Sequence, residues 1–192
     1  MPELQKILDS ANPVRIIEGI DIANIGGKEA VGSLVKFIDG RPFKAGYRRF
    51  KIKTVEGSDD YAMIAEVVRR RYKYAMAGEE LWPDLILIDG GLGQLHAAEN
   101  ALKQLLTAEN AENAEKLDIK LAGIAKREEE LYLPASPQSG GRGLAKGGQG
   151  STRPLKLPRH SPALKLLQYV RDEAHRFAQH YHHLLRSKKL LE

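Results

Sequence analysis

The stretch that most constrains the fold is residues 83–91, Pro-Asp-Leu-Ile-Leu-Ile-Asp-Gly-Gly. Its middle is a continuous apolar run in which no polar residue marks a solvent-exposed face. Such a run is typical of a strand buried on both faces of a sheet. Because the run ends in Asp89 and two glycines, we expect Asp89 at the carboxyl end of a central strand, where open α/β sheets bind ligands. An aspartate there would equally suit a turn in which it only caps the next helix.

A second segment has the same form. Residues 15–27 predict a strand that carries Asp21 and runs into a Gly-Gly loop. Residues 30–38 are rich in Val, Leu, Phe and Ile, and the Asp-Gly pair that follows them is a strong hairpin signal. Residues 43–53 then return as a third strand, so these three strands predict an antiparallel meander.

Helices and further strands alternate after the meander. Ser58-Asp59-Asp60 predicts the N-cap of a helix that runs to about Met76 and leads into the apolar strand, a crossover of the kind parallel strands require. A helix over 94–107, a strand over 118–125 and a last helix opened by Ser161-Pro162 complete the order. The order predicts an α/β fold with a ribonuclease H-like mixed five-stranded sheet, the meander plus parallel strands, flanked by helices.

The domain prediction follows from these elements. Residues 14–192 are expected to form one ribonuclease H-like domain, and residues 1–13 an N-terminal segment or the remnant of a linker. A region near 134–153 is rich in Gly, Ser, Pro and Gln, which predicts a mobile loop.

Composition limits the compartment and the metals. No apolar run approaches the roughly 20 residues that cross a bilayer, and the start lacks the apolar core of a signal peptide, so we expect a cytoplasmic protein with no membrane partner. Because the chain has no cysteine, carboxylate and imidazole groups would have to hold any metal. Oxygen-rich ligation favours Mg²⁺ or Mn²⁺.

Positive charge is concentrated near the end of the chain. The net charge is +5, but residues 153–189 hold nine Lys or Arg against two acids, a net +7 for that segment. Such a segment indicates a polyanion partner or a solvated helix face, and charge alone does not separate the two. The basic residues that we expect to contact the backbone of such a polyanion, with low affinity, are Arg48, Arg49, Lys126, Arg171 and Arg176.

The expected order of elements brings several acids together. Asp21 and Asp89 should lie side by side, with Asp59 or Asp60 at the start of the intervening helix and His175 on the last helix. Carboxylates crowded in this way raise one another's pKa, and divalent cations relieve the repulsion while supplying phosphodiester chemistry. A histidine at the edge of an apolar helix stripe is either such a ligand or a packed side chain.

Several motifs, in order along nearly the whole chain, resemble the C-terminal endonuclease domain of the UvrC family of excinucleases. They are Ile-Glu-Gly-Ile-Asp-Ile at 17–22, Tyr-Arg-Arg-Phe at 47–50, Asp-Asp-Tyr-Ala at 59–62, Arg-Arg-Arg-Tyr at 69–72, Leu-Ile-Leu-Ile-Asp-Gly-Gly at 85–91, Leu-Pro-Arg at 157–159 and Arg-Asp-Glu-Ala-His-Arg-Phe-Ala at 171–178. The chain departs from the family at Ala23-Asn24, where Ser-His is usual, and at Leu92, where Lys or Arg is frequent.

The resemblance implies a ribonuclease H-like endonuclease that uses a divalent metal to incise damaged double-stranded DNA on the 5′ side of a lesion, in nucleotide excision repair with excinuclease subunits A and B. The implied catalytic residues are Asp21, Asp89 and His175, which would also hold the metal, together with Asp60 or its neighbour Asp59.

Two other functions compete with this one. A nucleotide-binding loop could be read from residues 90–94, but the glycine spacing fits neither standard phosphate loop and no Gly-Lys-Ser/Thr follows. A non-catalytic DNA-binding or scaffold domain of the same fold is the stronger rival, because a fold does not fix a function.

Overall fold

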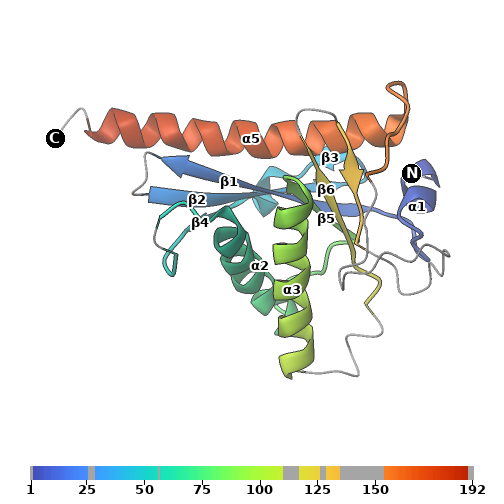
Figure 1. Ribbon diagram of the computed structural model, residues 1–192, viewed down its shortest axis with the longest axis horizontal. Coiled ribbons are helices and arrows are strands. Elements are labelled where there is room, and N and C mark those ends of the chain that lie inside the picture. The colour runs from blue at the N-terminus through green and yellow to red at the C-terminus, as the bar shows by residue number, and fades with distance from the viewer. Residues whose placement is uncertain are drawn as a thin grey trace, which may run out of the picture.

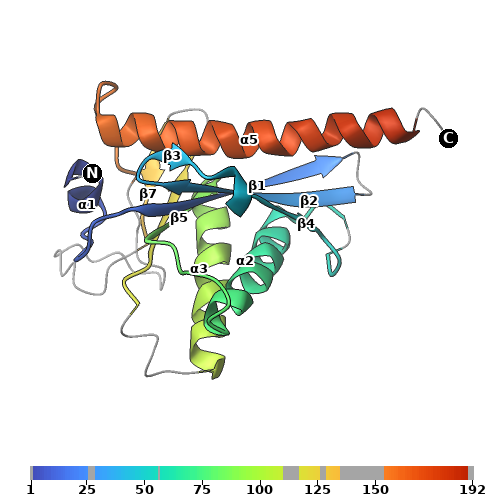
Figure 2. The same cartoon turned by 180° about the vertical axis from the view of Figure 1, so that it is seen from behind.

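A mixed sheet divides the molecule into two helical layers. The computed structural model describes residues 2–25, 29–55, 57–109, 117–125, 129–134 and 154–189. The long helix α5 crosses one face of the sheet, and α2 and α3 cover the other (Figures 1 and 2). The strands are β1 (Ile16–Ile25), β2 (Glu29–Ile38), β3 (Arg41–Pro42), β4 (Arg48–Lys51), β5 (Leu85–Asp89), β6 (Lys120–Ile124) and β7 (Leu131–Tyr132). The helices are α1 (Pro2–Ile7), the 3₁₀ turn η1 (Lys44–Gly46), α2 (Asp60–Met76), α3 (Leu92–Glu109) and α5 (Pro162–Lys189).

The sheet topology confirms the predicted α/β class. The strand order is β3-β2-β1-β5-β6-β7, with β4 also paired to β2. β1 and β2 pair antiparallel, whereas β1, β5 and β6 are parallel to one another, as the meander and the helical crossovers predicted.

Over the described residues the sheet has seven strands, not the five expected. Of the third strand predicted over residues 43–53, only β4 is extended, because η1 turns the chain at Lys44–Gly46. The additional strand β3 lies before that range, next to the predicted hairpin turn. The two-residue strand β7 is too short to show a periodic pattern in the sequence.

Each face of the sheet packs against its own hydrophobic core. On each face, a glycine in a strand allows a helix to approach the sheet closely. On the α5 face, a Cβ at Gly19 would lie 2.6 Å from Cγ1 of Val170. On the α2 face, a Cβ at Gly32 would lie 2.3 Å from Cγ2 of Val67. Both helices therefore rest almost on the strand backbone, which fixes their side chains relative to the sheet.

The amino-terminal segment packs on the body. Leu4 and Leu8 are buried in the core on the α5 side. The carboxylate of Glu3 accepts hydrogen bonds from the Ser161 hydroxyl at 2.8 Å and the Ala163 amide at 3.2 Å, so it helps to cap α5. The division between 1–13 and 14–192 stays a prediction, and the expected mobile loop lies, apart from Pro134, outside the described residues.

A group of charges is buried between β1 and α2. Glu18 is fully buried, and its carboxylate accepts hydrogen bonds from Nε and Nη2 of Arg71 at 3.1 and 2.7 Å and from the Tyr72 hydroxyl at 3.0 Å. The ammonium of Lys36 lies 3.4 Å away. Nη2 of Arg71 also contacts Glu80 at 2.9 Å, while Nη1 has no partner within the described part of the chain. The group joins the strand that carries Asp21 to the helix behind it.

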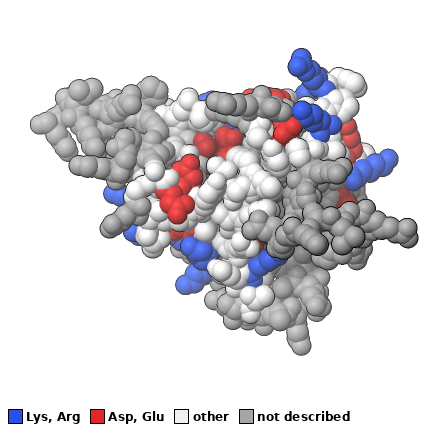
Figure 3. Space-filling model, viewed as in Figure 1, with Lys and Arg blue, Asp and Glu red and all other residues white. Residues whose placement is uncertain are grey.

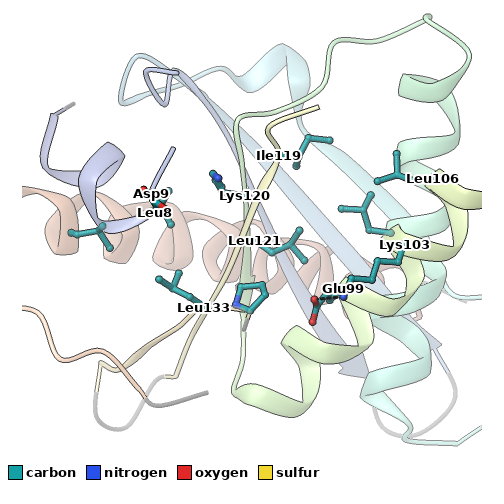
Figure 4. Close-up of a pocket in the computed structure, with 12 residues that line it drawn as sticks. Leu8, Asp9, Glu99, Lys103, Leu106, Ile119, Lys120, Leu121 and Leu133 are labelled. Carbon is teal, nitrogen blue, oxygen red and sulfur yellow. Dashed lines mark hydrogen bonds and ion pairs between the residues drawn. The ribbon is translucent and has the colours of Figure 1, made fainter. Parts of the chain in front are cut away.

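An apolar cavity lies away from the carboxyl ends of the parallel strands. It has a volume of about 400 Å³ and lies among α1, α3 and β6, with Leu8, Leu102, Leu121 and Leu133 among its mostly apolar lining (Figure 4). Lys120, at the amino end of β6, also lines it, whereas Asp89 ends β5 at the opposite edge. No helix in the described residues is long and apolar enough to cross a membrane.

Candidate active site

Three side chains from three different elements converge at the carboxyl edge of the parallel strands. β1 and β5 pair with Ile20 opposite Ile88, so the next residues, Asp21 and Asp89, are neighbours at the edge. His175 comes down from α5. One ligand atom from each of the three lies within 4.8 Å of the other two, which makes the group able to hold a metal ion. These are the residues that the sequence predicted would meet.

The alternation of side chains along β1 directs Asp21 toward α5. Gly19 faces Val170 on α5 while Glu18 faces α2, so Asp21 lies on the α5 side of the sheet, with 9% of its side chain exposed. On β2, opposite Asp21, the hydroxyl of Ser33 donates to the carbonyl of Ala174 at 3.1 Å. This bond fixes the α5 backbone one residue before the histidine.

The imidazole of His175 is bonded at both nitrogens. Nδ1 lies 3.2 Å from Oδ2 of Asp21, and Nε2 lies 2.9 Å from the amide nitrogen of Gln179, one helical turn later. With the amide as donor, Nε2 accepts and Nδ1 carries the proton that it donates to Asp21. The side chain is 38% exposed. The ring is thus oriented by a carboxylate and accessible, not enclosed in the core.

The two acids at the start of α2 differ in their contacts. Asp59 is the N-cap, and its carboxylate accepts a hydrogen bond of 3.0 Å from the amide of Ala62. Asp60 is the first helical residue, is exposed, and is not part of the three-residue group. Capping occupies Asp59, so we retain Asp60 as the predicted fourth acid.

Arg49 lies in line with Asp21 across the sheet. Asp21 is opposite Ser33 on β2, and Ser33 is opposite Arg49 on β4, so the three side chains share the α5 face. Arg49 lies with its guanidinium carbon 4.1 Å from the ring centroid of Phe177 on α5. A cation is therefore held about two strand spacings, roughly 10 Å, from the acidic group.

Arg176 is also on the surface near this site. Its side chain is 59% exposed and donates two hydrogen bonds of 2.6 Å to Glu173, which hold the pKa of Glu173 below its usual value. The Tyr47 hydroxyl donates to the same carboxylate at 2.9 Å, and burial together with this charge raises the pKa of Tyr47. Arg176 is accessible to a phosphate, although Glu173 neutralises part of its charge.

The remaining predicted DNA contacts are less well placed. Arg171 is only 8% exposed and is held by Asp172 and Glu129, so we assign it a structural role in place of the expected phosphate contact. Arg48 points to the α2 side of the sheet, 3.7 Å from Glu80. Lys126 lies outside the described residues. On the face drawn in Figure 3, basic side chains are scattered toward the edges with acidic ones between them, and form no continuous basic field among the coloured residues.

Sequence reasoning missed the residues that support the histidine. Gln179 could have been found, since it follows His175 by four residues on a helix and so shares its face. Ser33 carries no local signal, because its contact with Ala174 joins residues 141 positions apart.

Comparisons with known proteins show the family of the chain. The family model described as the UvrC RNAse H endonuclease domain matches residues 5–179. The UvrABC system protein C of Chlorobaculum tepidum is 42% identical over 191 residues, covering 100% of this chain and 26% of the relative. That of Methanosarcina acetivorans is 43% identical over 192 residues, covering 100% and 32%. The chain therefore spans about a quarter to a third of the length of these relatives.

Solved structures show weaker likeness. Ciona intestinalis Endonuclease V in complex with an inosine-containing 24mer DNA gives a TM-score of 0.42 at 16% identity, covering 74% of this chain and 60% of that one. RuvC of T. thermophilus in complex with a Holliday junction substrate gives 0.29 at 13% identity, covering 58% and 65%. Similarity at this level does not distinguish between functions.

Proposed function

Because the chain belongs to the UvrC RNase H endonuclease domain family, we propose that it is the catalytic part of a divalent-metal-dependent endodeoxyribonuclease that makes the 5′ incision in nucleotide excision repair. The observation that carries the proposal is the convergence of Asp21, Asp89 and His175, with ligand atoms within 4.8 Å of one another. A scaffold that only bound DNA would gain nothing from two acids placed together, since they would repel each other and the DNA backbone.

The donor set fits Mg²⁺ or Mn²⁺. Asp21 and Asp89 supply carboxylate oxygens and His175 a ring nitrogen, and the group is reachable from solvent through His175 and Asp89, both only partly buried. A divalent cation bound there would offset the two negative charges and favour attack on a phosphodiester.

The protein's own residues have separate roles in this proposal. Asp21 would hold the cation, and its contact with Nδ1 of His175 keeps the imidazole in one orientation. For His175 to bind the cation as well, the ring nitrogen that faces the cation must carry no proton. Asp89 completes the acidic pair from the neighbouring strand, and Asp60 adds a carboxylate from the start of α2. Arg49 and Arg176 contact phosphates of the damaged duplex, which makes binding salt-dependent and indifferent to sequence.

Partners and compartment follow from the same proposal. The relatives are named as the C protein of the UvrABC system, so we propose that excinuclease subunits A and B deliver the damaged DNA to this domain. Repair of chromosomal DNA places the reaction in the cytoplasm.

The test is nicking of supercoiled plasmid by the 192-residue chain with Mn²⁺ or Mg²⁺. The wild type should nick, EDTA should abolish nicking, and Asp21→Asn should bind DNA without cutting it. Asp9→Asn, which changes an exposed aspartate on the loop after α1, should nick like wild type. A wild type that binds DNA and never nicks it would support the scaffold alternative.

The side of incision needs a second measurement. A duplex with one lesion, labelled at either end and supplied with relatives of subunits A and B, should yield the fragment cut 5′ to the lesion. A fragment cut only on the 3′ side would contradict the assignment.

A further inference from the structure

Tyr61 is an exposed aromatic residue whose ring lies on the first turn of α3. It is the second residue of α2, and 54% of it is exposed. A Cβ at Gly93 would lie 2.7 Å from the Tyr61 hydroxyl oxygen and 2.8 Å from two ring carbons. The phenol end of the ring therefore rests directly on the α3 backbone, and only glycine at position 93 leaves room for it.

In sequence, this contact lies close to two of the proposed acids. Tyr61 directly follows Asp60, and Gly93 lies four residues after Asp89. α2 and α3 lie side by side on the same face of the sheet, and the contact of Tyr61 with Gly93 joins their amino-terminal turns (Figure 1). The ring thus connects the helix that begins at one proposed acid with the helix that begins just after another.

Packing on Gly93 uses the phenol end of the Tyr61 ring and leaves about half of the residue exposed. Tyr72 and Tyr47 both donate hydrogen bonds to carboxylates, and each contacts another aromatic ring. Within the described residues, Tyr61 has neither a hydrogen bond nor an aromatic neighbour. Single exposed aromatics are common on surfaces, so the position beside the acids, not the exposure alone, carries the inference. Tyr74, 52% exposed near the other end of α2, offers an exposed tyrosine for comparison.

We infer that Tyr61 is a positioning residue that stacks on a base of the DNA strand beside the scissile phosphate, a role that rests on the proposed nuclease function. Every base has an aromatic face, so stacking adds affinity without selecting a sequence, which suits an enzyme that must cut wherever a lesion lies. Because the ring already rests on Gly93, it loses little freedom when a base covers it.

The experiment uses the 192-residue chain with the Asp21→Asn change, so that DNA binds without being cut. Duplexes carry the fluorescent base 2-aminopurine at successive positions, and both fluorescence and anisotropy are followed. At one or two adjacent positions, Tyr61 should quench the probe. Tyr61→Phe should retain the quenching, whereas Tyr61→Leu should abolish it and weaken binding roughly fivefold to tenfold, at the low end of the loss of one stacked base.

Two further variants sharpen the result. Gly93→Ala should displace the ring and reproduce the loss of quenching while Tyr61 remains present. Tyr74→Leu should leave quenching and affinity unchanged. Quenching that survives in Tyr61→Leu would overturn the inference, and so would equal losses in Tyr61→Leu and Tyr74→Leu. A loss in Tyr61→Phe as large as in Tyr61→Leu would assign the effect to the hydroxyl and also overturn stacking.

Failure of this inference is separable from failure of the proposed function. If wild type nicks plasmid with Mn²⁺ but Tyr61→Leu matches it in quenching and affinity, only the stacking role is lost. If wild type neither nicks nor binds DNA, the nuclease assignment itself fails and the role of Tyr61 is overturned with it.

Discussion

Replacing Glu18 with Gln should strongly destabilise the fold while nearly preserving the shape of the side chain. Glu18 is fully buried and is the shared acceptor for Arg71, Tyr72 and Lys36. The amide of glutamine has no negative charge, and its nitrogen cannot accept a bond. Glu18→Gln therefore leaves two cations, both at least 89% buried at the side chain, without their main counter-charge.

The size of the destabilisation depends on the counter-charges that remain near the buried cations. Removing one partner of a buried ion pair costs about 3–5 kcal/mol. Glu80, 2.9 Å from Arg71, is retained and supports the lower end of that range. At roughly 2–4 °C per kcal/mol for a chain of this size, a loss of about 3 kcal/mol should lower the melting temperature by roughly 6–12 °C.

The assay is urea and thermal unfolding followed by circular dichroism. Glu99→Gln is the control, because it removes a surface pair with Lys103, whose side chain is 67% exposed, and such pairs contribute under about 1 kcal/mol. Adding Arg71→Met to Glu18→Gln should recover part of the loss, since the double variant leaves one fewer buried charge unpaired. A loss below about 1 kcal/mol for Glu18→Gln, or simple additivity in the double variant, would refute the reasoning.

Three further outcomes are expected. His175→Ala should reduce nicking at least about a hundredfold with little loss of stability. His180→Ala, at an exposed position on the same helix, should change neither nicking nor stability. Full activity in His175→Ala would reduce the site to carboxylates alone. Burial alone would raise the pKa of Glu66, but hydrogen bonds from a threonine, an arginine and two backbone amides lower it. The ionised carboxylate therefore stabilises the fold above the usual pKa of a glutamate, and this stabilisation is lost as the pH falls through the lowered pKa. Unfolding measured from about pH 6 to pH 3 should show a loss of stability that is smaller in Glu66→Gln. Gly32→Ala should cost on the order of 1–3 kcal/mol by denaturant unfolding because its Cβ would meet Val67 on α2, and an unchanged midpoint would show that the helix can shift freely.

Elements whose signals lie in neighbouring residues could be predicted from the sequence. The apolar run before Asp89 predicted a buried parallel strand, and the structure has β5 at Leu85–Asp89, buried except at its last residue. Ser161-Pro162 predicted the start of α5, which begins at Pro162 with the Ser161 hydroxyl accepting from the Leu164 amide at 3.1 Å. Such signals depend on neighbouring residues, so one sequence is enough to identify them.

Non-local features could not be predicted in the same way. The burial of Arg171 depends on Glu129, 42 residues earlier, so counting basic residues along the last helix gave no warning that this one is enclosed. The pairing of β4 with β2, which aligns Arg49 with Asp21, likewise depends on register across the sheet. Registers of this kind are set by packing and turn geometry together, which a sequence pattern alone does not contain.

His175 lies on α5, in the helical layer above the sheet, whereas the two carboxylates lie on strands of the sheet. His175 follows Asp21 by 154 residues and reaches it only because α5 has closed over the finished sheet. During synthesis, a chain that has already folded the meander and β5 would hold both acids without the imidazole. Under the proposed nuclease function, the site would be complete, and incision possible, only once α5 has been synthesised and has docked on the sheet.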